Sequence, residues 1–373
     1  MRAMAFTSIQ LIIVSVFLLI LQCCTINAFV IKSFGHCESL PKIFEEEEAS
    51  RLHLSSGCND GYHLKKNEQT PSDQFNRRQV IQAPTLVVMQ QITQPTLCHA
   101  SDENSQISRG TTFEITDPDS YSAVVYVPKA KNVKDNNIAT DAAPKSLPLL
   151  VVVHGAGVNE HSALYEFTTP GGDHTNLPPY LLSTQQAPAT LAENFVVVSP
   201  YVGKGKRSLY DEPRSKLLSF IRWFNTYIET QTFADGSNIS INRQKVSLFG
   251  FSEGATLAVE LATTRQFQGV VTASYGFTGP LPKMAIERLQ GIPIWAFYSK
   301  GDDIYNVKCS DKLVDSLLSY EGGLDVFAVG DIIKYTKLVP STDDKVEPGK
   351  EHVRAALVAS RSADVYSWLL SLK

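Results

Sequence analysis

Residues 246–261 read VSLFGFSEGATLAVEL, an apolar run, a serine flanked at two positions by glycines, and a helix-forming run. The first four residues predict a buried strand and the last seven predict a helix. A G-x-S-x-G pattern between a strand and a helix is typical of a tight turn that exposes its serine, here Ser252. Glycine at Gly250 and Gly254 lets neighbouring backbone approach this turn without a Cβ clash. We therefore expect Ser252 to stand on a strand-to-helix turn as a nucleophile.

A serine hydroxyl becomes a strong nucleophile only when a base takes its proton and a carboxylate orients that base. The chain has eight histidines, and only His352 follows Ser252. Between the two, the apolar run 292–298 predicts a strand, and the turn after it contains Asp302 and Asp303. Both aspartates qualify by residue type as the orienting acid.

A second buried strand is predicted for residues 149–153, which read LLVVV and lead into His154-Gly155-Ala156-Gly157. The tetrahedral intermediate of acyl transfer carries negative charge that backbone NH groups must meet. Small residues after the strand let the backbone turn its amides toward the serine, so this loop is a candidate oxyanion hole. His154 is expected to pack beneath the loop rather than to act as a base.

On these motifs the chain resembles the α/β-hydrolase superfamily. The superfamily's chain order is Ser, then Asp or Glu, then His, which implies that His352 is the base. The acid turn of the superfamily commonly reads His-Gly-x-x-Asp-Asp, with the first aspartate as the triad acid. The resemblance therefore implies Asp302 as the acid, although Tyr298-Ser299 replaces His-Gly in this chain.

The resemblance extends over residues 111–373 and favours the carboxylesterase, feruloyl-esterase-like and "predicted peptidase" branch. By similarity to the H-G-x-G loop of esterases, the Ala156 and Glu253 NH groups would form the oxyanion hole. The implied activity is cleavage of a small-molecule carboxylic ester through an acyl-enzyme on Ser252, with no cofactor and no metal. A serine peptidase of the same fold and a catalytically inactive binding protein remain as alternatives, because fold does not determine function.

Strands that alternate with helices predict an α/β fold, in which a mostly parallel sheet carries helices on both faces. The further predicted strands are short and apolar: 121–127, 195–200, 270–275, and finally either 324–329 or 335–339. Helices are expected over 217–228 and 363–370, where apolar residues recur mostly at spacings of three and four. His352 is expected in a loop after the last strand.

The N-terminal part has a different composition. Residues 1–28 predict a signal peptide, because Arg2 precedes the apolar run 11–21. This run is shorter than a membrane-spanning helix requires. Ala28 is the candidate cleavage residue, and an uncleaved signal anchor is the alternative and the one expected contact with a membrane. Residues 29–110 are polar with poor periodicity and predict a weakly structured leader before the catalytic domain at 111–373.

A signal peptide predicts the secretory pathway or an extracellular location. The junction Ala28-Phe29 also resembles that of precursors sent to the plastid of a secondary-endosymbiotic alga, which is the alternative location. The net charge of −4 and the scattered positions of lysine and arginine disfavour binding to nucleic acid.

Overall fold

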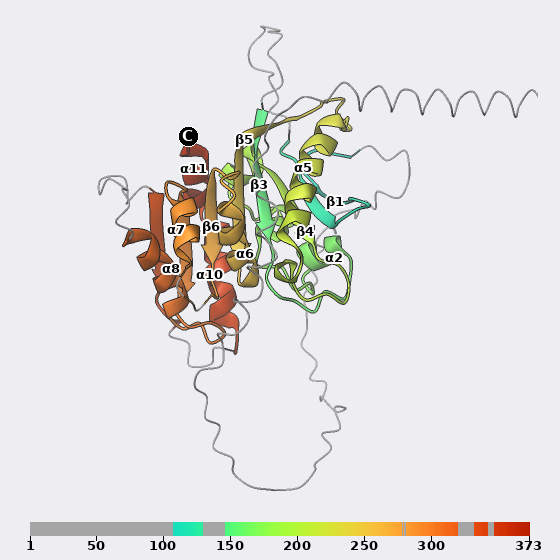
Figure 1. Ribbon diagram of the computed structural model, residues 1–373. Helices are drawn as coiled ribbons and strands as arrows, with labels where there is room; N and C mark the ends of the chain where they lie inside the picture. The colour runs from blue at the N-terminus through green and yellow to red at the C-terminus, as the bar shows by residue number, and fades with distance from the viewer. Residues whose placement is uncertain (1–106, 130–145, 278, 280, 320–331, 342–346) are drawn as a thin grey trace, which may run out of the picture. The chain divides into compact units, whose positions relative to one another are not determined.

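The computed structural model describes residues 107–129, 146–277, 279, 281–319, 332–341 and 347–373. Within these residues, one mixed sheet has the strand order β1-β2-β4-β3-β5-β6-β7-β8 (Figure 1). The strands are β1 (Thr112–Thr116), β2 (Ser122–Tyr126), β3 (Ser146–Val153), β4 (Val196–Tyr201), β5 (Ser240–Phe251), β6 (Gly269–Ala273), β7 (Ile294–Ser299) and β8 (Ile333–Leu338). Strand β2 is antiparallel to both neighbours, and the pairs from β4 to β8 are parallel.

The helices fall into two groups that cover opposite faces of this sheet. One group consists of α5 (Arg214–Thr230), α6 (Glu253–Ala262), α7 (Lys283–Leu289) and α8 (Lys308–Leu318). The other consists of α2 (Ala163–Thr168), α3 (Pro178–Ser183), α4 (Ala189–Asn194), α10 (Lys350–Arg361) and α11 (Ala363–Ser371). In Figure 1, α5, α6 and α7 lie over the sheet on the viewer's side.

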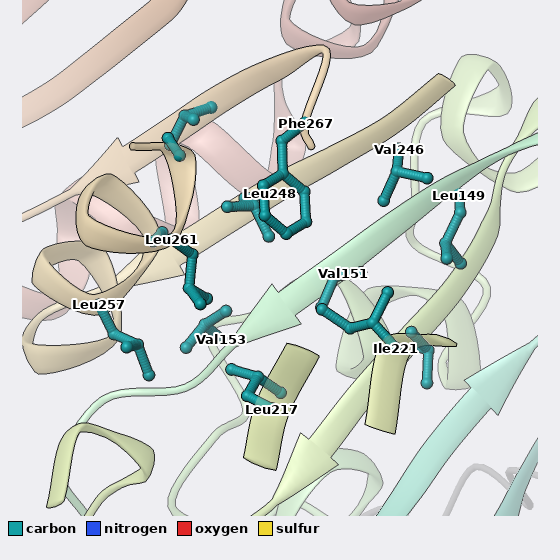
Figure 2. Close-up of a cluster of buried hydrophobic side chains, with 14 of the residues drawn as sticks. Leu149, Val151, Val153, Leu217, Ile221, Val246, Leu248, Leu257, Leu261 and Phe267 are labelled. Carbon is teal, nitrogen blue, oxygen red and sulfur yellow. The ribbon is translucent and has the colours of Figure 1, made fainter. Parts of the chain in front are cut away.

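Alternation along each strand explains the two groups. In β3, Leu149, Val151 and Val153 enter the core beneath α5 and α6, which Figure 2 shows. Leu150 and Val152 enter the second core on the other face. Because successive side chains of a strand point to opposite faces, a strand that is apolar at every position must be covered on both sides. The predicted fold class is confirmed.

The parallel strands all end at the same edge of the sheet. The register pairs Val153 with Gly250, Phe251 with Ala273, and Ser299 with Leu338. The turns that follow β3, β5, β6 and β7 are therefore brought together with the end of β8, although Val153 and Leu338 are 185 positions apart in the sequence.

The helix α10 corrects one prediction. His352 was expected in a loop, but it lies in the first turn of α10. This helix begins directly after Gly349, whose φ is 81°. The buried apolar residues of this helix are alanines, Ala355, Ala356 and Ala359, and its first turn buries polar residues. Because alanines give only a weak hydrophobic pattern, periodicity did not predict this helix.

Other boundaries also differ from those expected. Strand β5 begins at Ser240, well before the apolar run, and β1 was not predicted because only Phe113 and Ile115 of this edge strand are buried. Strand β8 matches the second of the two alternatives for the last strand, and residues 324–329 lie outside the described residues.

The predicted signal peptide and nearly all of the predicted leader also lie outside the described residues. The last residues of that leader, from Ile107, are described, and the Ala234 NH donates to the Ile107 carbonyl at 2.9 Å. Across the described parts of the chain, no helix combines the length and apolarity that a membrane crossing requires.

Candidate active site

Ser252 stands on the sharp turn between β5 and α6, with φ 56° and ψ −124°. A positive φ is a strained conformation for a residue with a Cβ and needs support from its surroundings. The two flanking glycines supply close backbone packing. A Cβ on Gly250 would lie 2.4 Å from the Gly254 carbonyl oxygen, and a Cβ on Gly254 would lie 2.2 Å from the Val153 carbonyl oxygen. The motif is therefore required by sterics, because any larger residue would push α6 away from β3 and β5.

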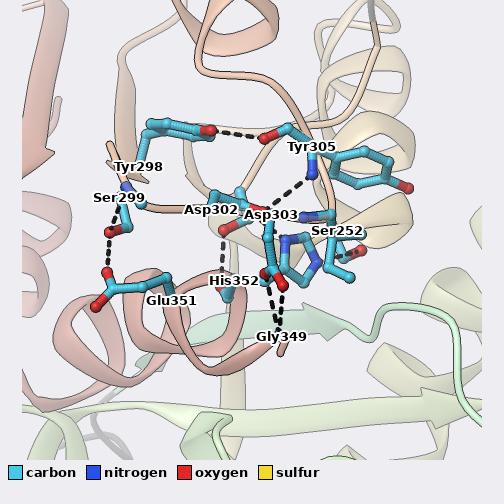
Figure 3. Close-up of polar contacts among 12 residues, drawn as sticks. Ser252, Tyr298, Ser299, Asp302, Asp303, Tyr305, Gly349, Glu351 and His352 are labelled. Atoms are coloured by element: carbon cyan, nitrogen blue, oxygen red, sulfur yellow. Dashed lines mark hydrogen bonds and ion pairs between the residues drawn. The ribbon is translucent and has the colours of Figure 1, made fainter. Parts of the chain in front are cut away.

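The His352 imidazole lies between the serine and a carboxylate (Figure 3). Its Nε2 is 2.9 Å from Ser252 Oγ, and its Nδ1 is 2.8 Å from Asp302 Oδ2. The ring packs between Phe251 and Tyr305, with ring centroids 5.1 Å and 5.2 Å away. An ionised carboxylate only accepts hydrogen bonds, so Nδ1 carries the proton and Nε2 is left to accept from the serine. Ser252 and His352 are 6% and 7% exposed, which keeps this arrangement largely out of bulk water.

Asp302 is suited to hold this tautomer. Its side chain is completely buried, and its Oδ1 accepts from the Ile304 and Tyr305 NH groups at 2.9 Å and 3.0 Å. Burial raises the pKa of the Asp302 carboxyl, but the bond to His352 and the two backbone amides outweigh burial and lower the pKa. Asp302 is therefore ionised at neutral pH.

The neighbouring aspartate has a different environment. Asp303 is exposed, and both its carboxylate oxygens lie within reach of the Gly349 NH, at 3.0 Å and 3.1 Å. The two aspartates were equal candidates by residue type, and the turn directs only Asp302 to the imidazole. The fold is decided by this strand order together with Ser252 on the turn after a central parallel strand, followed in the chain by Asp302 and His352.

The chain has the α/β-hydrolase fold.

Comparisons with known proteins give only distant similarities. No protein-family model matches the chain, and no curated protein matches it. Among solved structures, a thermostable esterase has a TM-score of 0.44 and 19% identity over 70% of this chain, which spans 62% of that esterase. The feruloyl esterase module from Clostridium thermocellum has a TM-score of 0.44 and 12% identity, with 70% and 88% of the two chains covered. An α/β serine hydrolase without a lid from Xanthomonas campestris has a TM-score of 0.37 and 12% identity, with 71% and 94% covered. None of these values transfers an activity to this chain.

The loop after β3 lies directly against the serine of this α/β-hydrolase fold. A Cβ on Gly155 would lie 2.9 Å from the Ser252 Cβ, so only glycine allows this approach. Ala156 follows in an exposed position, and the Gly157 NH donates to the Arg207 carbonyl at 3.1 Å. Glu253 is the first residue of α6, and NH groups in the first turn of a helix have no acceptor within the helix. The two predicted oxyanion amides thus belong to segments that adjoin Ser252.

His154 packs beneath this loop, as expected. It is completely buried, its Nδ1 is 2.7 Å from the Gly155 carbonyl oxygen, and the Val202 NH donates to its Nε2 at 3.4 Å. Burial lowers the pKa of His154 to about 4, against the opposing effects of the Gly155 carbonyl and Asp173. His154 is therefore neutral at physiological pH and has a structural role.

Two further residues shape the loop, and no sequence pattern marks either of them. Glu166 is buried and accepts from the Glu160, His161 and Asp173 NH groups at 3.1, 3.0 and 2.9 Å. Asn159 has a φ of 52° and donates from its side chain to the Lys206 carbonyl at 2.7 Å. These bonds satisfy backbone groups that the loop cannot pair within regular secondary structure.

Two other features bear on ligands. In the part of the chain that the structure describes, no group of three or more His, Cys, Asp or Glu side chains is placed to hold a metal ion. A cavity of about 610 Å³ is lined by residues near the amino ends of β5 and β6, among them Arg243, Val246 and Gln268. This cavity lies at the edge of the sheet opposite Ser252. Its lining includes none of Ser252, Asp302 and His352.

Proposed function

We propose that this chain is a serine hydrolase that cleaves carboxylic esters through an acyl-enzyme on Ser252. The proposal is carried by one observation, the His352 imidazole that bonds Ser252 Oγ at 2.9 Å and Asp302 Oδ2 at 2.8 Å. A serine, a histidine and an ionised aspartate in this geometry form the constellation that activates a hydroxyl for acyl transfer.

The first half of the proposed reaction forms the acyl-enzyme. His352 Nε2 takes the proton of Ser252 while Oγ attacks the ester carbonyl carbon, and the carbonyl oxygen becomes an oxyanion. The NH groups of Ala156 and Glu253 are the proposed donors to that oxyanion. Collapse of the intermediate breaks the bond to the alcohol, which receives the proton from His352 as it leaves.

The second half releases the acid. Water gives a proton to His352 and attacks the acyl carbonyl, and collapse of the second intermediate returns the proton to Ser252 Oγ. Asp302 keeps the Nδ1 proton in place throughout and stabilises the imidazolium that forms in each half. General base catalysis of this kind contributes on the order of 10²–10⁴ in rate, and removing one oxyanion donor costs about 10²–10³.

The experiment compares two substrate classes on the same protein. We expect the wild type to hydrolyse p-nitrophenyl acetate and butyrate faster than peptide p-nitroanilides. The Ser252→Ala variant is expected to lose this activity. A matched control is Ser215→Ala, because Ser215 is an exposed serine of α5 on the helix surface. Faster cleavage of the anilides would favour a peptidase, and no cleavage of either class would favour a binding protein.

A further inference from the structure

We propose that Glu351 is a positioning residue for His352, and that its buried carboxylate, bonded to Ser299, holds the first turn of α10 against the turn that carries Asp302. The inference rests on the proposed function, because positioning matters only if His352 acts as the base. Glu351 does not bond to Ser252 and acts only through its neighbour His352.

Glu351 receives hydrogen bonds from three separate segments of the chain. The Ser299 hydroxyl donates to its Oε2 (Figure 3), and the Ser341 NH donates to its Oε1 at 2.9 Å. Arg354, one turn further along α10, donates to the carboxylate at 3.0 Å and 3.3 Å. Glu351 is only 5% exposed, so these partners replace water around a buried charge.

The place of Glu351 in the helix links it to the imidazole. Glu351 and His352 are consecutive in the first turn of α10, so their side chains point in different directions. Figure 3 shows His352 directed to Ser252 and Glu351 directed to Ser299. Ser299 is the last residue of β7 and precedes Asp302 by three positions. The bond between Ser299 and Glu351 therefore sets how far the backbone of the histidine lies from the backbone of its acid.

Packing around the same contact is close. A Cβ on Gly301, between Ser299 and Asp302, would lie 3.0 Å from Glu351 Cγ and 3.2 Å from Pro340 Cβ. The turn over residues 299–303, which we call the acid turn, thus packs directly against the aliphatic part of the Glu351 side chain. Burial raises the pKa of Glu351, but the bonds from Ser299, Ser341 and Arg354 outweigh it and lower the pKa, so the carboxylate remains charged.

A second carboxylate joins the same two segments in the opposite direction. Asp303, on the acid turn, accepts from the Gly349 NH just before α10, whereas Glu351, on α10, accepts from Ser299 at the start of the acid turn. The linked residues Ser299 and Asp303 lie on either side of Asp302 in the sequence. The bond to Glu351 also gives a role to Ser299, which departs from the glycine usual at this position in the superfamily that the sequence resembles.

The test measures ester hydrolysis per active site, titrated with a fluorophosphonate, in four variants and a control. We expect kcat to fall about 10-fold in Ser299→Ala and about 100-fold in Glu351→Ala, with little change in KM, because small misplacements of a catalytic group are costly. Glu351→Gln should fall between the two, since an amide still accepts from Ser299. The double variant Ser299→Ala/Glu351→Ala should be no slower than Glu351→Ala, because both changes break one link.

The matched control is Glu347→Gln. Glu347 lies four residues before Glu351, and its side chain is 74% exposed and pairs only loosely with Lys350 at 3.2 Å. This variant should keep the wild-type kcat. If Glu351→Ala does not fold, Ser299→Ala and Glu351→Gln carry the test alone.

A second measurement follows the imidazole without catalysis. In protein labelled with ¹⁵N-histidine, the resonance of the His352 Nδ1 proton should shift in Ser299→Ala and stay unchanged in Glu347→Gln. Wild-type kcat per active site and an unshifted resonance in the Ser299 and Glu351 variants would overturn the inference. A wild type that hydrolyses no ester contradicts the proposed function instead, and the resonance then still decides whether Glu351 positions His352.

Discussion

The two sides of the candidate active site are held in place by different means. On the nucleophile side, β3, β5 and α6 meet through backbone, and Gly155, Gly250 and Gly254 stand where a Cβ would lie within 3 Å of other atoms. On the acid–base side, the β7 turn and α10 meet through side chains, with carboxylates at Asp302, Asp303 and Glu351. The first side is positioned by steric fit and the second by hydrogen bonds to charged groups.

This difference predicts different responses to substitution. A steric contact between backbone atoms has no flexible part, so an added methyl group must displace a whole element. A hydrogen bond between side chains can be removed while the fold remains, so its loss is expected to affect rate more than stability. The predictions below separate the two cases.

The largest expected effect is on rate, on the acid–base side. Asp302→Asn keeps the shape of the acid but favours the wrong tautomer of His352, so kcat should fall about 10⁴-fold, a far larger effect than the small drop expected in the thermal unfolding midpoint. Steady-state ester hydrolysis and thermal unfolding monitored by circular dichroism measure the two quantities.

The matched control for Asp302→Asn is the adjacent Asp303→Asn. It removes charge from the bond to the Gly349 NH and should lower kcat only about threefold, which equals about 0.7 kcal/mol. Equal losses in the two variants would contradict the assignment of Asp302 as the residue that orients His352.

The next effect is on stability, on the nucleophile side. Gly254→Ala places a methyl group 2.2 Å from the Val153 carbonyl oxygen and 2.4 Å from the His154 carbonyl oxygen. We expect the free energy of unfolding to fall by about 3 kcal/mol or more, together with most of the activity. Urea denaturation measures the change.

Gly236→Ala is the control for this variant. Gly236 has a positive φ, 74°, which Gly254 in α6 does not have, and open space surrounds the Gly236 Cβ position, so the cost should be about 1–2 kcal/mol from backbone strain alone. A loss in Gly254→Ala no larger than that in Gly236→Ala would contradict the steric requirement, because it would mean that β3 accommodates the added methyl group at little cost.

A smaller effect is expected from pH. The pKa of the Asp302 carboxyl is lower in the folded protein than in the unfolded chain, so it contributes stability that is present above about pH 4 and is lost as the pH falls through the folded value. The difference in unfolding free energy between wild type and Asp302→Asn should be largest near neutral pH and narrow under acid conditions. A difference that stays constant across this range would show that the Asp302 charge adds no stability.

The smallest effect is expected at the rim of the site. Arg207 forms an ion pair with Glu253, beside Ser252, but 68% of the Arg207 side chain is exposed. Exposed ion pairs are screened by water and contribute about 0–1 kcal/mol, so Arg207→Ala should change the unfolding free energy by less than about 0.5 kcal/mol. A loss of several kcal/mol would mean that this pair shares in the steric fit of the nucleophile side.

The same contrast explains what the sequence could predict. The turn that carries Ser252 could be predicted because its steric requirement falls on residues close together in the sequence, 250–254. The central strands could be predicted because parallel strands are apolar on both faces. Chain order pointed to His352, but α10 was missed because its buried apolar residues are alanines. Asp302 and Asp303 are the same residue type at adjacent positions, and only the fold of the turn separates them. Glu351 and Ser299 are 52 residues apart, and no local pattern marks the contact between them.

The central claim is that His352 and Asp302 make the Ser252 hydroxyl reactive. The most direct measurement is the intact mass of the protein after reaction with a fluorophosphonate, compared among wild type, Ser252→Ala and His352→Ala. We predict that the wild type gains a single label on Ser252, that Ser252→Ala gains none, and that His352→Ala reacts at least about 100-fold more slowly. An unlabelled wild type, or a His352→Ala variant that reacts as fast as the wild type, would contradict the claim.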